Sequence, residues 1–390
     1  MSLDLYATSV QLEKATLQLS QSWAEREKLL VDLVTALDSA GKDEFNQGEE
    51  NTRDGIPYLQ AECLEKPGIR HKPTALPTDY SVFAADGSHI DVERHLPIKC
   101  TLVNISVCQL DYGSIPSASL INRPTLAVNA SERCLIDPGN PKKTIALEGP
   151  LLGIKRAVDE LRALATRIKD SESNLTALGL VDGSLILWQL GGSGPPPGRY
   201  PPFVQQELLD NGLLSAMKEI EEVSSARNIA LAGYISLPGS KEIINSLLNK
   251  NDRGNTTDEL TDCDLFSKTL GVGERSALFA SRVPVVQERY GVMNAIRFFY
   301  LNVGEEVARV EMPSWVTMNS TLMEITHTLI LDQCQKGHGY PVALQEAHEQ
   351  AVINGTDREE FRQMVEEMLV MRHLPTFTSQ KQRSKIRRGV

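Results

Sequence analysis

Residues 178–184 read Leu-Gly-Leu-Val-Asp-Gly-Ser, and residues 82–88 read Val-Phe-Ala-Ala-Asp-Gly-Ser. Each segment is an apolar, strand-like run that stops at an Asp-Gly-Ser triplet. A carboxylate at the end of a strand can hold a divalent cation, which makes Asp86 and Asp182 candidate ligands. The alternative is a tight turn between two strands, because Asp-Gly favours hairpin turns in which the glycine has a positive φ.

Helical and β patterns alternate on both sides of these two runs. Apolar residues recur at helical spacing over 5–40, 150–169, 203–226, 240–249, 319–335, 341–353 and 357–371. Strand-like patterns cover 81–86, 96–110, 176–181, 229–236, 294–302 and 306–311, and the polar stretch 41–80 is a connector. Strands interleaved with helices predict an α/β fold.

Composition limits the class of protein. The chain has 390 residues, 41% of them hydrophobic, and a net charge of −11. It has no apolar run of bilayer length, no secretion-type N-terminus and no Cys-x-x-Cys pair, so we expect a cytoplasmic protein with no membrane partner. An acidic chain is not expected to grip duplex DNA by its whole surface, but a nuclease with a local groove remains compatible.

Two further residues are candidates for chemistry. Glu160 lies beside the apolar stripe of the predicted helix 150–169, where it could lean over a sheet end or remain a solvated edge residue. His348 lies on the apolar side of the predicted helix 341–353. It could be a general base, a phosphate contact or a metal contact, or a hydrogen-bonded histidine of the core.

Other motifs are absent or ambiguous. The chain lacks the G-x-x-x-x-G-K-[ST] phosphate loop, which disfavours an ATP-driven motor. The segment 191–202 is rich in glycine and proline. The tail 374–390 is basic, and is either a disordered end or a contact for DNA or an acidic partner.

Taken in order, these segments resemble the NurA family, nucleases that process DNA ends with a hexameric ATPase called HerA. The resemblance runs from about residue 81 to about residue 370. It depends on short motifs at 84–88, 160–161, 180–184, 233–238, 264–266, 273–276, 298–301, 309–313, 340–341, 344, 347–348 and 351. The first 75 residues and the basic tail have no match in it.

The resemblance implies an RNase H-like mixed sheet flanked by helices, with an N-terminal helical extension. The expected parts are an extension and connector at 1–75, a NurA-like nuclease domain at 76–373 and a disordered tail at 374–390. The implied catalytic residues are Asp86, Glu160, Asp182 and His348, and the three carboxylates are the implied metal ligands.

The implied cofactor is Mn²⁺, with Mg²⁺ as a weaker substitute, and the implied activity is 5′→3′ degradation of DNA with single-strand cutting during repair and end resection. The implied partners are DNA, a second copy of the chain and a HerA-like hexameric ATPase. The rival interpretation is a non-catalytic NurA-like scaffold that regulates a DNA translocase. The N-terminal helix, with Leu12, Leu19, Trp23, Leu30 and Leu33, could pack across the dimer or on its own core.

Overall fold

A computed structural model describes residues 4–47, 52–53, 56–57, 59–91, 98–191, 200–248 and 260–374. The strands are β1 (Thr52–Arg53), β2 (Ile56–Pro57), β3 (Ala61–Cys63), β4 (Tyr80–Ile90), β5 (Thr101–Tyr112), β6 (Ser117–Ala127), β7 (Cys134–Asp137), β8 (Asn140–Ala146), β9 (Thr176–Asp182), β10 (Ile229–Ile235), β11 (Phe279–Ser281), β12 (Ile296–Asn302) and β13 (Val307–Pro313).

The longer helices are α1 (Leu5–Ser39), α3 (Pro150–Asp170), α5 (Ser215–Arg227), α7 (Asp262–Thr269), α10 (Ser320–Lys336), α11 (Val342–Ala351) and α12 (Gly355–Met371). Shorter helical segments are α2 (Lys42–Asn46), η1 (Trp188–Leu190), α4 (Pro202–Gln205), the π-helical η2 (Gln206–Leu214) and η5 (Val286–Tyr290), α6 (Glu242–Leu247), α8 (Gly291–Asn294) and α9 (Ser314–Thr317). Among the described residues, no helix combines the length and apolar character needed to cross a bilayer.

One mixed sheet of nine strands organises the chain, in the order β3-β11-β12-β13-β10-β9-β4-β5-β6. Strands β4, β5 and β6 form an antiparallel meander. Strand β9 then pairs parallel to β4, and β10 pairs parallel to β9. A three-stranded meander followed by two parallel strands on the side of its first strand is the RNase H-like arrangement, and the predicted fold class is confirmed.

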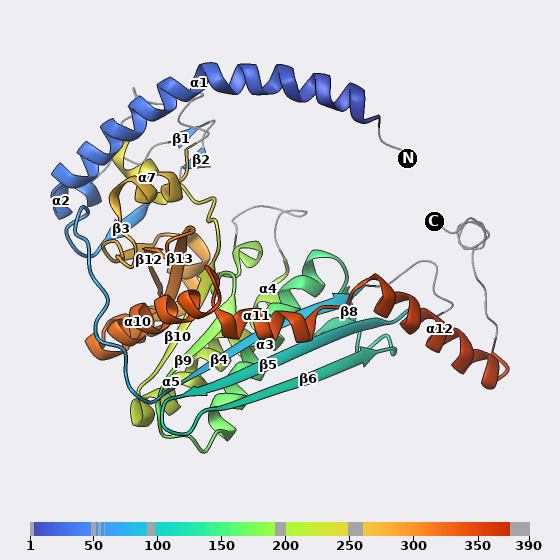
Figure 1. Ribbon diagram of the computed structural model, residues 1–390. Coiled ribbons are helices and arrows are strands. Elements are labelled where there is room, and N and C mark those ends of the chain that lie inside the picture. Colours follow the sequence, from blue (N-terminus) through green and yellow to red (C-terminus); the bar gives the residue numbers. More distant parts are fainter. Residues whose placement is uncertain are drawn as a thin grey trace.

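Helices cover both faces of this sheet, with α3 and α5 on one side and α10 and α11 on the other (Figure 1). The predicted stripe of α3 is buried, namely Ile154, Val158, Leu161, Ala165 and Ile168. Strand β9 is buried at its centre, as a parallel strand covered on both faces should be. A Cβ on Gly179 would lie 3.1 Å from Ile168 Cδ1, so this glycine lets α3 pack closely on the sheet.

The N-terminal helix divides into two parts. Leu30, Leu33 and Leu37 are buried in a second hydrophobic cluster with phenylalanines of α7, β11 and β12. By contrast, Leu12 and Trp23 are exposed, and Figure 1 shows the N-terminal end of α1 projecting away from the sheet. The packing of Leu30 and Leu33 on the chain's own core is therefore confirmed, while the side chain of Leu19 lies outside the described residues.

Several segments differ from the sequence expectations. Strand β4 does not stop at Asp86 but continues to Ile90, because β5 pairs with it along its whole length. The connector contributes β3 to the main sheet. The long strand β6 and the β7–β8 hairpin were not predicted, since most of their side chains are exposed and show no apolar alternation. Residues 192–199 of the proline-rich loop and residues 375–390 of the basic tail lie outside the described residues.

Candidate active site

Asp86 and His348 form a direct pair. Asp86 lies in the middle of β4 and is 7% exposed, so the hairpin-turn interpretation of this triplet is wrong. His348 Nδ1 lies 2.7 Å from Asp86 Oδ2, although 262 residues separate the two in the chain. The His348 side chain is 57% exposed, so the alternative of a core histidine is wrong as well.

The residues around Asp86 fix the end of α11. The Ser88 hydroxyl donates a hydrogen bond to the Ala351 carbonyl, and Asn104 Nδ2 donates to the same oxygen at 3.0 Å. The last carbonyls of a helix have no partner within the helix, so these two donors from β4 and β5 satisfy one of them. His348 lies one turn before this anchored end, and its ring is therefore held against Asp86.

Glu160 reaches the site from the opposite face of β4. Alternate residues of a strand face opposite sides, and a Cβ on Gly87 would lie 2.7 Å from Glu160 Oε1. Glu160 is 4% exposed, so the interpretation as a solvated edge residue is wrong. Burial raises its pKa to about 8; the nearby Arg156 opposes this shift, whereas Asp86 and Asp182 add to it. Glu160 Oε1 lies 3.3 Å from Arg156 Nε but has no hydrogen-bond partner.

Asp182 is the last residue of β9. Gly183 follows with φ +104°, a conformation that favours glycine, and its N–H donates to the Tyr234 carbonyl at 2.8 Å. The turn does not lead into a hairpin, since both neighbours of β9 are parallel to it. The Ser184 hydroxyl donates to Glu311 Oε2 at 2.7 Å, which fixes the chain directly after Asp182.

The other groups of the site also affect the pKa of the Asp182 carboxyl. Partial burial raises its pKa, a hydrogen bond from the Tyr340 phenol opposes the shift, and repulsion from Asp86 adds to it. His348 and Arg156 act in the opposite direction on the same group. The structure thus brings all four predicted residues into one region, with Asp86 and His348 in contact and the other two carboxylates coupled to them by charge.

The donor set suits a hard cation. Carboxylate oxygens are the ligands that Mn²⁺ and Mg²⁺ prefer. Glu160 presents a buried oxygen without a hydrogen-bond partner, and repulsion among the three carboxylates would fall if a cation lay between them. Among the described residues, no three His, Cys, Asp or Glu side chains are already drawn together as a ligand cluster. The residue types and their charges therefore fit a divalent cation.

Sequence reasoning did not assign a role to three residues near the site. Tyr340 belongs to a motif used for the resemblance, and its hydroxyl hydrogen-bonds Asp182. Arg156 precedes Glu160 by one helical turn, a spacing that brings two helical side chains together. Glu311 is completely buried and accepts hydrogen bonds from Ser184 and the Leu185 N–H, although its sequence context resembles an exposed strand.

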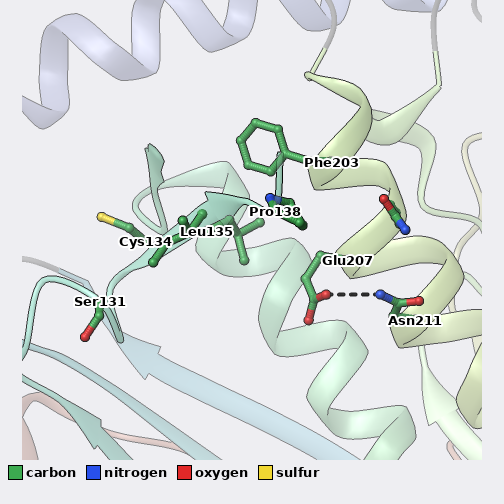
Figure 2. A pocket seen from close by; sticks show the side chains of 9 residues that line it. Ser131, Cys134, Leu135, Pro138, Phe203, Glu207 and Asn211 are labelled. Atoms are coloured by element: carbon green, nitrogen blue, oxygen red, sulfur yellow. Dashed lines mark hydrogen bonds between the residues drawn. The ribbon is translucent and has the colours of Figure 1, made fainter. Parts of the chain in front are cut away.

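A cavity of about 250 Å³ lies elsewhere, between the β7–β8 hairpin and the α4–η2 segment. Figure 2 shows Phe203 and Pro138 at this cavity, with Glu207 hydrogen-bonded to Asn211. None of the four candidate residues lines it. This cavity is therefore separate from the acidic site.

In this RNase H-like fold, Asp86 lies on β4, Glu160 on α3 and Asp182 at the end of β9. The NurA domain matches residues 80–353, and the chain belongs to the NurA family of nucleases. No curated protein matches the chain in sequence.

Solved structures show more distant likenesses. The NurA nuclease of Sulfolobus solfataricus is 13% identical, with 91% of this chain and 97% of that chain covered and a TM-score of 0.47. The Argonaute protein of Aquifex aeolicus is 8% identical, with 72% and 29% covered and a TM-score of 0.26. A type 1 RNase H, LC9-RNase H1, is 11% identical, with 44% and 71% covered and a TM-score of 0.19.

Proposed function

We propose that this protein is a metal-dependent nuclease that hydrolyses phosphodiester bonds at DNA ends, in the 5′→3′ direction and with cutting of single strands. The observation that carries the proposal is that Asp86, Glu160 and Asp182, which come from three separate elements, interact by charge beside a histidine that is bonded to the first of them. Glu160 Oε1 is buried and, among the described residues, accepts no hydrogen bond although it lies near Arg156, so a bound cation would compensate its burial.

Asp86, Glu160 and Asp182 would hold Mn²⁺, with Mg²⁺ as a weaker substitute. When bound, such cations activate water and stabilise the leaving oxygen of a phosphodiester. His348 contributes a proton-transfer group. Its Nδ1 faces an aspartate, and an ionised Asp86 favours the tautomer in which Nδ1 donates and Nε2 accepts. Nε2 is then available to orient water or to carry a proton to the leaving group.

The first test removes single carboxylates. Asp86→Asn and Asp182→Asn should abolish cleavage of labelled DNA in Mn²⁺ while leaving the thermal melting curve intact. Asp159→Asn is the matched control: Asp159 is the neighbour of Glu160, but it pairs with Lys155 on the outside of α3. Full cleavage by either site variant would refute the site assignment.

The second test concerns the cation and the histidine. Chelation should stop cleavage, and added Mn²⁺ should restore it. His348→Ala should lower turnover by about 10²- to 10⁴-fold, the usual contribution of a proton-transfer residue, while DNA affinity changes little. Cleavage that persists in the presence of a chelator would rule out the carboxylate–metal mechanism. An unfolded His348→Ala protein would show that this histidine is structural.

We further propose that the protein acts in the cytoplasm as a homodimer with a HerA-like hexameric ATPase during DNA repair. The net charge of −11 supports this proposal, because non-specific affinity for duplex DNA comes from neutralising phosphates. A translocating partner would supply the capture that the chain lacks. Light scattering should give twice the chain mass of 43.0 kDa, and duplex processing should rise steeply with ATPase and ATP. A monomer at micromolar concentration would contradict the dimer, and product mapping on 5′- and 3′-labelled strands tests the polarity.

A further inference from the structure

Among the described residues, no strand covers one edge of the last residues of β4. Strand β9 pairs with β4 only from Tyr80 to Ala85, whereas β4 continues to Ile90 beside β5 on its other edge. Backbone carbonyls two residues apart in a strand point to the same side. The carbonyls of Gly87 and His89 therefore share one orientation, and each accepts a hydrogen bond from an arginine.

These two arginines come from helices that are far apart in the sequence. Arg156 Nη1, from α3, donates to the Gly87 carbonyl, and Arg358 Nη2, from α12, donates to the His89 carbonyl at 3.1 Å. Both positive charges also act on His89 and lower its pKa, an effect in the same direction as burial, which is the largest cause. Two guanidinium groups thus lie in a row along the uncovered edge.

These contacts do not use all the N–H donors of either arginine. A guanidinium carries five N–H donors, and a single carbonyl uses only one or two of them. Arg156 also forms an ion pair with Glu160, Nε to Oε1 at 3.3 Å, but among the described residues neither of these two atoms makes a hydrogen bond. Within the described part of the chain, Arg358 has no carboxylate ion pair.

The row begins at the acidic site. Arg156 contacts the residue directly after Asp86 and lowers the pKa of both Glu160 and Asp182. Arg358 contacts the carbonyl of His89, two residues further along β4. Two residues span about 6.6 Å at the rise of a β-strand. An extended nucleic-acid strand repeats its phosphate charge at a comparable interval. The guanidinium group of arginine binds phosphate through two N–H groups at once, which suits two arginines at this spacing.

We propose that Arg156 and Arg358 bind two consecutive phosphates of a nucleic-acid strand, so that the uncovered edge of β4 guides the substrate away from the acidic site. This inference builds on the proposed nuclease function and adds the residues that position its substrate. It also explains how a chain of net charge −11 can hold a polyanion locally.

The test is the salt dependence of binding, measured with chelated protein and a fluorescent single-stranded DNA so that no cleavage occurs. Each phosphate contact on a single strand contributes a slope of about −0.7 in log K against log salt. Arg358→Gln should therefore flatten the slope by about 0.7, and the double variant with Arg156→Gln by about 1.4. Arg358→Lys, which keeps the charge, should retain the slope.

Arg162→Gln is the matched control, because Arg162 lies on α3 but donates to the Asn211 carbonyl, away from β4. A folded Arg358→Gln protein with an unchanged slope would overturn the inference. If that variant does not fold, the wild-type protein still gives an answer. Replacing two adjacent phosphates next to the cleavage position by neutral methylphosphonates should flatten its slope by about 1.4, and no change would refute the pair.

The outcome also separates the two proposals. A flattened slope in a protein that never cleaves DNA would support phosphate binding by Arg156 and Arg358 and refute the proposed nuclease function. Cleavage by the wild-type protein, together with unchanged slopes in the variants, would support the nuclease function and refute phosphate binding by the two arginines. In a cleaving protein, Arg358→Gln should raise KM more than it lowers kcat, because a positioning residue on the flank acts chiefly through substrate binding.

Discussion

Substitution of Arg309 tests how the Asp182 turn is supported. Arg309 is 2% exposed and lies between two buried carboxylates: its Nη1 contacts Glu242, and its Nε lies 2.9 Å from Glu311 Oε1. Its guanidinium also lies 3.6 Å from the centre of the Phe298 ring. Burial raises the pKa of Glu242, and the charge of Arg309 and its hydrogen bond to the carboxylate oppose that shift.

Arg309→Met would leave two buried carboxylates without a cation. Breaking a buried pair by removing one partner costs about 3–5 kcal/mol. This is a large part of the total stability of a typical domain, which is about 5–15 kcal/mol. We expect a loss of about 3–5 kcal/mol in the free energy of unfolding, measured by urea denaturation followed by circular dichroism. Since Glu311 also holds Ser184, cleavage should fall further than the folded fraction alone explains.

Two control variants show which result would contradict this prediction. Arg289 pairs with Asp210 at the surface, where both side chains are about one third exposed, so Arg289→Met should cost at most about 1 kcal/mol. Adding Glu242→Gln to Arg309→Met should restore part of the stability, because it removes one unpaired charge. If Arg309→Met costs no more than Arg289→Met, or if Glu242→Gln worsens it, the buried network does not carry this energy.

Three further predictions concern Asp262, Gly183 and Leu33. The pKa of Asp262 is raised to about 7, chiefly by burial, so the folded state retains a proton that the unfolded state releases near pH 4. The contribution of Asp262 to stability should therefore be lost between about pH 4 and 7, so the wild-type urea midpoint should fall relative to that of Asp262→Asn over this range. Gly183→Ala places a side chain at φ +104° and should cost about 1–3 kcal/mol by the same assay, whereas Gly153→Ala, on the open side of α3, should be neutral or stabilising. Leu33→Ala should cost about 2–5 kcal/mol because Leu33 is 2% exposed, and Leu12→Ala, at 59% exposure, should change the urea midpoint little.

Local sequence patterns predicted the elements that bury many apolar residues. The stripe of α3, the apolar run of β9 and the β12–β13 pair all follow from residue spacing, and the structure has them within a few residues. Strand β6 was not predictable in this way, because its residues are largely exposed on an edge strand and carry no alternation. Sequence patterns report burial, so an element with little burial gives little signal.

The site was only partly predictable, for a different reason. Asp182 follows an apolar run and could be recognised as a strand-end carboxylate. The environment of Glu160 depends on Gly87 and Arg156 packing over it, and the role of His348 depends on a contact with a residue 262 positions away. Helical phase placed Glu160 beside an apolar stripe and His348 on an apolar face, and phase alone does not distinguish a solvated from a buried position there.

The two Asp-Gly-Ser triplets reach the same region by different physical routes. In β4 the triplet stays extended: Asp86 faces His348, Gly87 leaves room for Glu160 on the other face, and Ser88 holds the end of α11. In β9 the strand ends, Gly183 turns the chain, and Ser184 is held by Glu311. The glycine is required in both, by a close approach in β4 and by a positive φ after β9. A substitution at Gly87 should therefore disturb Glu160 before it disturbs the backbone, and one at Gly183 should displace Asp182 through the backbone itself.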